Sequence, residues 1–447
     1  MSQYTQRGQA LPLALVLLVA VAATVFFMFN SGQLVQEKIR LTNTADAVAY
    51  SAGVYEARVF NYDAYTNRAI IANEIAIGQA VGLASWAKYM GTSAATIGPY
   101  LYLIPYVGSL LADLMDYIET IMDYVTLALS YVIPMHDAAI QALMVSQYAM
   151  HGPSNAVALV NRKTVMDEVA KKNDPDAKVD LIPLGDNFWG FTERYTDEKR
   201  TRMGQVVSDG RDAFLKSRNW NFGLVLLCTG VELRKRGGTE LIDLTEGWKS
   251  MDTLSAHAYR LKISWSGIKC KHSETPIGYG TAFSTDDLDD DDYSYAGSRS
   301  TNPSASDKAD SDEGIANGFD PAPYSIGGGT IPAFHELSES ALKQDDPRTQ
   351  ITIRVTKSSG KQRYSGGNSI IKPSGSLDLY QGDHANGLSA SIARAEVYFE
   401  RPDGPSPLFS GKAEKGSLFN PYWQVRLVPV SAAERALAQG IQGRFLP

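Results

Sequence analysis

The chain opens with a long apolar run that is bounded by charge on both sides. Leu11 to Phe29 is almost wholly apolar, and no charged residue occurs between Gly8 and Gln36. A bilayer core of about 30 Å needs roughly 20 apolar residues in a helix. A cleaved secretory signal has a shorter apolar core of about 7–15 residues, followed by a small-residue cleavage site. The run therefore predicts one retained transmembrane helix over Leu11 to Phe29.

Helical periodicity continues beyond the apolar run, through about Arg58. Ala45, Ala49 and Gly53 recur every four residues, so they fall on one face of this helix. Small residues at that spacing let another backbone approach closely. This helix packing face has two interpretations, which are contact with a partner subunit and contact with the chain's own later helices.

Residues 61–175 also show helical periodicity, which places Glu74 away from the apolar face. Glycines and prolines from Gly91 to Gly108 are expected to interrupt the helix. Thr92 to Ala112 contains no charged residue, so a second membrane span is one alternative. The prolines, glycines and tyrosines of this stretch favour an apolar loop or hairpin outside the membrane.

After Pro175 the pattern changes to the alternation typical of strands. Phe222 to Cys228 is a continuous apolar run that suits a strand buried on both faces. Val231 to Ile242 resembles a hairpin that turns at its Gly-Gly pair. A terminal helix is expected to begin at Ser431, with Glu434 completing a capping box. Further strands are expected at residues 179–183, 260–265, 350–356, 391–401 and 422–430.

These elements predict an α+β protein, in which an N-terminal transmembrane helix extends into a helical region and a β-rich domain follows. The expected regions are listed in chain order. They are 1–60, the anchor and its helix; 61–175, helical; 176–283, β-rich; 284–325, an acidic disordered loop; and 326–447, β-rich with a short C-terminal helix.

Composition adds two limits to this picture. The chain has 447 residues, a net charge of -7 and a mean hydropathy of -0.18, values that exclude a protein lying mostly in lipid. No basic run is longer than Arg234 to Arg236, so no nucleic-acid partner is expected. The acidic run Asp286 to Asp292 predicts a solvated loop. A calcium site is the alternative there, although the spacing lacks the pattern of an EF-hand loop.

Several segments resemble one family. The residues Arg-Gly-Gln-Ala-Leu-Pro-Leu at 7–13, the apolar run, and Leu-Thr-Asn-Thr-Ala-Asp-Ala at 41–47 resemble the N-terminal module of Tad-type (Flp) pilus assembly proteins, the TadE/TadG-like group. This resemblance covers about residues 5–60. Residues 65–74 and 420–431 are similar to longer members of the group.

The resemblance implies a single-span inner-membrane protein of a Gram-negative bacterium with most of its chain in the periplasm. Its function would be non-enzymatic, as a scaffold or minor pilin-like subunit of pilus assembly, and its partners would be the membrane and other pilus subunits. One rival is a surface-displayed, adhesin-like subunit at a pilus tip. A second rival is a periplasmic enzyme.

Processing of the N-terminus is a separate question that the resemblance raises. Related pilin-like members are cleaved after a glycine, and Gly8–Gln9 is the corresponding bond here. Those members carry Glu at the fifth mature position, which would be Leu13 in this chain. A leucine cannot pair with a neighbouring subunit's terminal amine, so we expect a retained anchor.

The motifs of common chemistries are absent from the sequence. It contains no His-Glu-x-x-His, no Walker A sequence and no Gly-x-Ser-x-Gly elbow. We therefore expect no catalytic, cofactor-binding or metal-binding residues. The two cysteines, Cys228 and Cys270, would form a disulfide in an oxidising periplasm, and two buried thiols are the alternative.

Overall fold

The computed structural model describes residues 10–151, 157–264, 267–284, 293–319, 331–362, 388–401 and 414–442. The fold is α+β, as predicted, and begins with one long helix, α1 (Ala10–Leu101). The chain forms two compact units, neither of which is continuous in sequence. Unit 1 comprises Met1–Ala64, Ala149–Glu193 and Glu336–Pro447, and unit 2 comprises Tyr65–Tyr148 and Arg194–His335. These units do not coincide with the five consecutive regions expected from the sequence.

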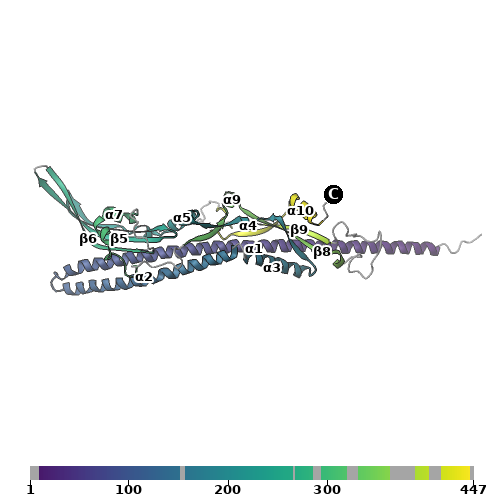
Figure 1. Ribbon diagram of the computed structural model, residues 1–447, viewed down its shortest axis with the longest axis horizontal. Coiled ribbons are helices and arrows are strands. Elements are labelled where there is room, and N and C mark those ends of the chain that lie inside the picture. Colours follow the sequence, from purple (N-terminus) through teal and green to yellow (C-terminus); the bar gives the residue numbers. More distant parts are fainter. Residues whose placement is uncertain are drawn as a thin grey trace, which may run out of the picture. The chain divides into compact units, whose positions relative to one another are not determined.

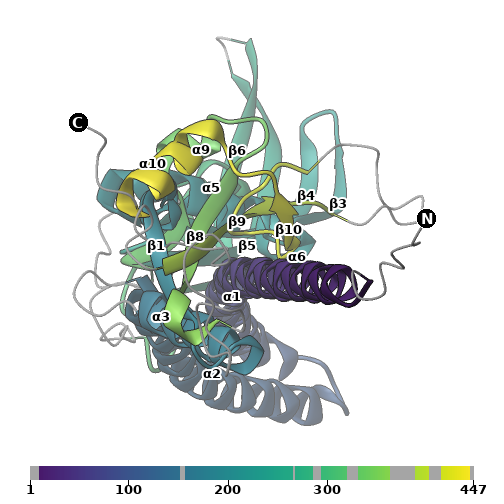
Figure 2. The same ribbon diagram turned by 90° about the vertical axis from the view of Figure 1, so that its right-hand side faces the viewer.

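Unit 1 contains a four-stranded antiparallel sheet of order β1-β8-β9-β10. Its strands are β1 (Lys178–Asp186), β8 (Arg348–Ser358), β9 (Leu388–Phe399) and β10 (Trp423–Val428). Its shorter helices are α3 (Val157–Asn173), α4 (Phe188–Phe191), α9 (Glu339–Leu342), α10 (Ala432–Gln442) and the 3-10 turn η3 (Ser359–Lys361). Within this unit, α1 passes alongside both the sheet and α3 (Figures 1 and 2).

The core of unit 1 joins segments that are far apart in sequence. Ala45 and Ala49 of α1 are fully buried in one cluster with Met166 of α3, Ile353 of β8 and Ala395 of β9. The alanines expose little side chain, so the sheet and α3 can approach the backbone of α1 closely. The first strand of this sheet begins at Lys178 and the last ends at Val428, so the core is complete only when both chain halves meet.

The C-terminal helix α10 begins as the sequence predicts. The Glu434 backbone N–H donates to Ser431 Oγ at 3.2 Å, and the Ser431 backbone N–H donates to Glu434 Oε2 at 2.9 Å. These two reciprocal bonds form a capping box, which satisfies backbone donors that the first helical turn leaves unpaired. The predicted strands at 350–356, 391–401 and 422–430 correspond to β8, β9 and β10 within a few residues.

Unit 2 combines a helical hairpin with a second antiparallel sheet, of order β3-β4-β5-β6. The strands are β3 (Trp220–Leu226), β4 (Thr229–Asp243), β5 (Gly247–Ser264) and β6 (Gly267–Phe283). The helices after α1 are α2 (Gly108–His151), η1 (Asp197–Arg200), α5 (Thr201–Asp209), α6 (Ala213–Lys216), η2 (Tyr295–Gly297), α7 (Ser298–Thr301) and α8 (Pro303–Ala309). A separate two-stranded sheet pairs β2 (Thr192–Thr196) with β7 (Ala333–Leu337).

The expected interruption at Gly91 to Gly108 is wrong over most of its length, because α1 continues to Leu101. The glycines serve helix packing instead. A Cβ built on Gly91 would lie 3.6 Å from Met122 of α2, and one built on Gly98 would lie 3.4 Å from Met115. The turn occupies residues 102–107, so the apolar loop that the sequence predicted is confined to these residues, and the rest of the stretch 92–112 is helical.

Two strand predictions in unit 2 are also wrong. Val231 to Ile242 is not a hairpin but part of the single long strand β4. Its Gly-Gly pair lies inside the strand, at a position where a side chain on Gly237 would overlap Asp252 of β5. The chain turns earlier, at Leu227 and Cys228, whose φ angles of 45° and 63° fit a tight two-residue turn. β3, expected to be buried on both faces, is an exposed edge strand.

Two further expectations from the sequence also differ from the structure, one for Glu74 and one for residues 293–319. Glu74, expected on the polar face, is buried and accepts a hydrogen bond from Trp248 Nε1 at 2.8 Å. Residues 293–319, expected to belong to a disordered loop, contain η2, α7 and α8. Tyr295 and Ala305 from these elements are fully buried with Met251 of β5. The acidic run at 286–292 lies outside the described residues.

Candidate functional site: the anchor helix

The first part of α1 presents apolar side chains that nothing in the described structure covers. Leu11, Leu18 and Met28 are 75%, 69% and 67% exposed. Its one hydroxyl is satisfied within the helix, because Thr24 Oγ1 donates to the Ala20 carbonyl at 2.9 Å. By length and composition, two described helices, α1 and α2, are apolar enough to cross a membrane. For α1 no residue of the qualifying window is buried, as expected of a helix that contacts lipid.

An ionic cluster forms where α1 enters the folded part of unit 1. Lys357 Nζ of β8 donates to Glu37 Oε2 of α1 at 2.9 Å and to Asp174 Oδ2, just after α3, at 2.8 Å. All three side chains are nearly buried. Burial alone would lower the pKa of Lys357, but its bonds to Asp174 and Glu37 raise the pKa above the usual value. The cluster therefore fixes the base of the anchor to the sheet with a charged lysine.

The predicted helix packing face is used inside the chain. Ala45 and Ala49 are 0% exposed. A Cβ built on Gly53 would overlap Val425 of β10 and lie 3.3 Å from Ala395 Cβ of β9. Among the described residues, the elements that cover this face are strands of the same chain and α3, and contact with a partner subunit stays a prediction.

The same face of α1 continues into a buried charge that sequence reasoning missed. Glu56 is 0% exposed, pairs with Arg162 of α3 and accepts a hydrogen bond from Thr349 Oγ1 of β8 at 3.0 Å. Arg162 also donates to Asp186 Oδ1 at 3.2 Å, so one cation serves two carboxylates. Burial, which Arg162 only partly offsets, raises the pKa of Glu56 to about 7.

A second missed carboxylate lies two helical turns later. Asp63 is 0% exposed, and its Oδ2 lies 2.7 Å from His151 Nε2. Burial raises the pKa of Asp63, although the neighbouring His151 opposes that shift. The spacing held a signal, because Gly53, Glu56 and Asp63 are separated by three and seven residues and share one face of α1.

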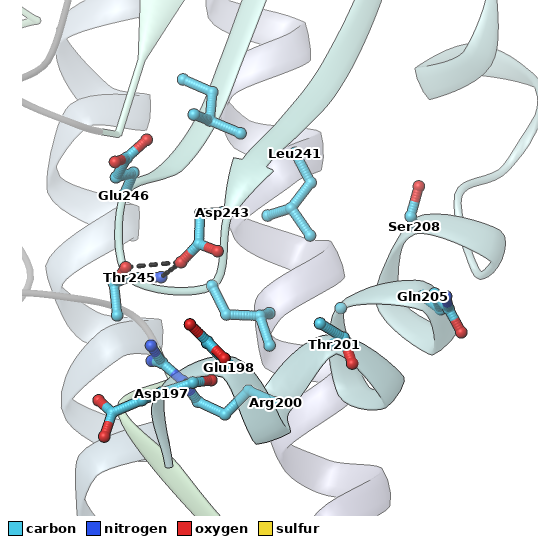
Figure 3. Close-up of a pocket in the computed structure, with 13 residues that line it drawn as sticks. Asp197, Glu198, Arg200, Thr201, Gln205, Ser208, Leu241, Asp243, Thr245 and Glu246 are labelled. Atoms are coloured by element: carbon cyan, nitrogen blue, oxygen red, sulfur yellow. Dashed lines mark hydrogen bonds between the residues drawn. The ribbon is translucent and has the colours of Figure 1, made fainter.

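Unit 2 contains an open pocket of about 770 Å³ between α5 and the β4–β5 turn (Figure 3). The pocket is lined by four acidic residues, Asp197, Glu198, Asp243 and Glu246. The basic residue Arg200 also lines it. Asp243 Oδ1 is engaged locally, because it accepts hydrogen bonds from the backbone N–H and hydroxyl of Thr245 at 2.7 and 2.6 Å. Among the described residues, no three His, Cys, Asp or Glu side chains are placed to bind one metal ion. The prediction that the protein has no cofactor stays a prediction.

Two other pairs of site residues were predicted from the sequence, a processing site and a disulfide. Gly8 and Gln9, the proposed processing site, lie outside the described residues. Cys228, in the β3–β4 turn, and Cys270, in β6, have Cα atoms 5.7 Å apart and sulfur atoms placed for a bond. That Cα distance is typical of disulfides. Neither cysteine is near the anchor in sequence, and both belong to unit 2.

A comparison with known protein families gives one match, which covers the N-terminal part of α1. Residues 8–57 match the Tad family model, described as Flp pilus-assembly TadE/G-like. The chain carries a TadE/G-like domain. This domain includes the exposed apolar part of α1, the Glu37 ion pair, the small-residue face and Glu56. No curated protein and no solved structure matches the chain significantly. The TadE/G-like domain associates the protein with pilus assembly. The family match does not extend beyond residue 57.

Proposed function

We propose that this protein is a membrane-anchored, non-enzymatic component of Tad/Flp-type pilus assembly, acting as a scaffold or minor pilin-like subunit. One observation carries the proposal: the TadE/G-like domain at residues 8–57 coincides with an exposed apolar helix that continues unbroken into the core of unit 1. The anchor and the core of unit 1 therefore share one continuous helix. A folded domain that is anchored in the membrane suits a role in pilus assembly, because subunits must be held at the bilayer while they are assembled.

The periplasmic side of the inner membrane is the proposed location of the folded body. Lys and Arg residues around the span do not decide its orientation, since Arg7 precedes it and Lys38 and Arg40 follow it. The cysteine pair gives a second argument. Cys228 and Cys270 have the separation of a disulfide, and such bonds persist in oxidising compartments such as the periplasm.

Complementation of a deletion strain tests the function. Loss of the gene should abolish or strongly reduce surface pili, and the wild-type gene should restore them. Leu18→Arg places a charge in the apolar run and should not restore pili, because a charge at a bilayer centre costs several kcal/mol. Val35→Arg is the matched control, since Val35 is 55% exposed on the same helix but lies beyond the span. Normal piliation in the deletion strain would contradict the proposal.

The choice between scaffold and minor pilin-like subunit depends on processing. N-terminal sequencing of protein from membranes and from sheared pili separates the two roles. A mature start at Gln9, found in sheared pili, would support an incorporated subunit. An intact Met1, found only in membranes, would support a scaffold, which is the outcome we expect because Leu13 replaces the glutamate of pilin-like members.

A further inference from the structure

One side of the sheet of unit 2 packs on helix α1 around Gly78 and Ser85. Trp248 of β5 is fully buried there, and a Cβ on Gly78 of α1 would lie 2.9 Å from its ring. Ser85 Oγ of α1 donates to Asp252 Oδ2 at 2.6 Å from the same side. Alternate residues of a strand share a side, and so do residues directly opposite in register. We call the side that carries Trp248 and Asp252 the helix-facing side.

The helix-facing side continues beyond the part that α1 covers. The distal arm is the free end of the sheet, made of residues 220–226, 229–233, 256–262 and 269–273. On it, Phe222 pairs with Leu233 and Leu224 pairs with Val231, all on the helix-facing side. Phe222 and Leu224 are 72% and 67% exposed. In Figure 1 the free end of β5 and β6 curves away from α1 and α2. Within the described part of the chain, no helix therefore covers Phe222 and Leu224 on the helix-facing side.

Basic residues lie beside this apolar strip on the same side. Val231 pairs with Ala258, which places Arg260 and Lys262 on the helix-facing side. Across the next ladder, Arg260 pairs with Lys271 and Lys262 pairs with Lys269. All four basic side chains are exposed. Like charges opposite one another repel, so this arrangement is unfavourable until an acidic partner covers it.

Helix α2 of the same unit has the complementary chemistry. Its exposed apolar residues follow the alternating spacing of four and three that helix partners use. They are Leu110, Leu114, Tyr117, Ile121 and Tyr124. α2 contains no Lys or Arg. Its N-terminal half carries four acidic residues, namely Asp113, Asp116, Glu119 and Asp123, of which Asp113 and Asp116 are exposed.

We propose that the distal arm of one copy of this chain packs on the N-terminal half of α2 of a second copy. Two arguments select this occupant. The arm continues a side of the sheet that already packs on a helix of its own chain, and the arm is apolar and basic where α2 is apolar and acidic. Opposite charges across an interface steer association and fix its register. The inference goes beyond the proposed role in pilus assembly and does not depend on it.

Charge reversal on each surface, followed by mixing, tests the proposal in the full-length protein in detergent. Lys262→Glu with Lys269→Glu should weaken self-association at least about tenfold by light scattering, and Asp113→Lys with Asp116→Lys should do the same. An equimolar mixture of the two variants should recover association, because each pairs its reversed surface with the other's. Lys171→Glu, an exposed change on α3, is the control and should have no effect.

The alternative occupant of the arm is an anionic bilayer. Vesicles containing phosphatidylglycerol, compared with vesicles of phosphatidylcholine alone, separate the two. Binding to anionic vesicles that is lost with Lys262→Glu and Lys269→Glu, in a protein that does not self-associate, would overturn the proposal. Self-association that ignores both pairs of substitutions would also overturn it. Retention of the far-ultraviolet circular dichroism spectrum shows that each exposed variant folds.

Discussion

Gly53 of α1 lies so close to Val425 of β10 that a Cβ on Gly53 would overlap Val425 Cγ2. Gly53 belongs to the TadE/G-like domain, whereas Val425 lies near the end of the chain. The contact therefore makes the anchor helix part of the core of unit 1. Glycine at this position is required for close approach of the strand, and not for flexibility of the helix.

Replacement of Gly53 by alanine tests this contact. Alanine should raise helix propensity by about 1 kcal/mol. Overlap with Val425 should cost about 1–3 kcal/mol and so place the thermal midpoint of unfolding below that of Gly32→Ala, which gains the same propensity without an overlap. Gly32→Ala is the matched control in the same helix, because no heavy atom lies within 4 Å of a Cβ built there. Equal midpoints for the two variants would show that Val425 does not pack against Gly53.

The buried Glu56 predicts a pH dependence of stability. Its pKa is raised from 4.5 to about 7, so the folded chain holds an extra proton between these values. Stability from this group is fully present below pH 4.5 and is lost as the pH rises through 7, by about 3 kcal/mol in all.

Glu56→Gln is the variant that isolates this effect. Glutamine keeps a neutral side chain of the same size, so the difference in unfolding free energy between wild type and variant should change with pH from 4.5 to 7. Chemical denaturation at a series of pH values measures it. Parallel curves would mean that Glu56 titrates normally, so that burial does not raise its pKa in the folded chain.

A disulfide between Cys228 and Cys270 is a further prediction. Their separation of 42 residues corresponds to a stabilisation of about 4 kcal/mol in the chain-entropy model. Protein from membranes, denatured without reductant, should not react with a thiol-specific polyethylene glycol, and after reduction it should gain two labels. Reaction of both thiols before reduction would contradict the bond and would remove one argument for a periplasmic location.

The sequence predicted those features that depend on local chemistry. The apolar run of α1 and the capping box of Ser431 and Glu434 depend only on residues that are close together in the sequence, so the sequence pattern alone identified them. The Gly-Gly pair in β4 misled prediction because Asp252, on another strand, is what requires glycine at Gly237. Glu74 was placed on the wrong face because its partner, Trp248, lies far along the chain.

The candidate site was predictable to a similar extent. The small-residue face of α1 was recognised from its spacing of four. Its partner was not, because β9 and β10 follow it by more than three hundred residues. Glu56 and Lys357 were missed for the same reason, since the value of a buried charge depends on a counter-ion brought in by the tertiary fold.

Membrane fractionation with protease protection tests the anchored, periplasmic arrangement most directly. After carbonate extraction we expect the wild-type chain to remain in the membrane pellet, and Leu18→Arg to be released in part or degraded. In spheroplasts, added protease should digest the folded body, whereas intact cells should protect it. A wild-type chain that carbonate releases, or one that resists protease in spheroplasts until they are lysed, would contradict this arrangement.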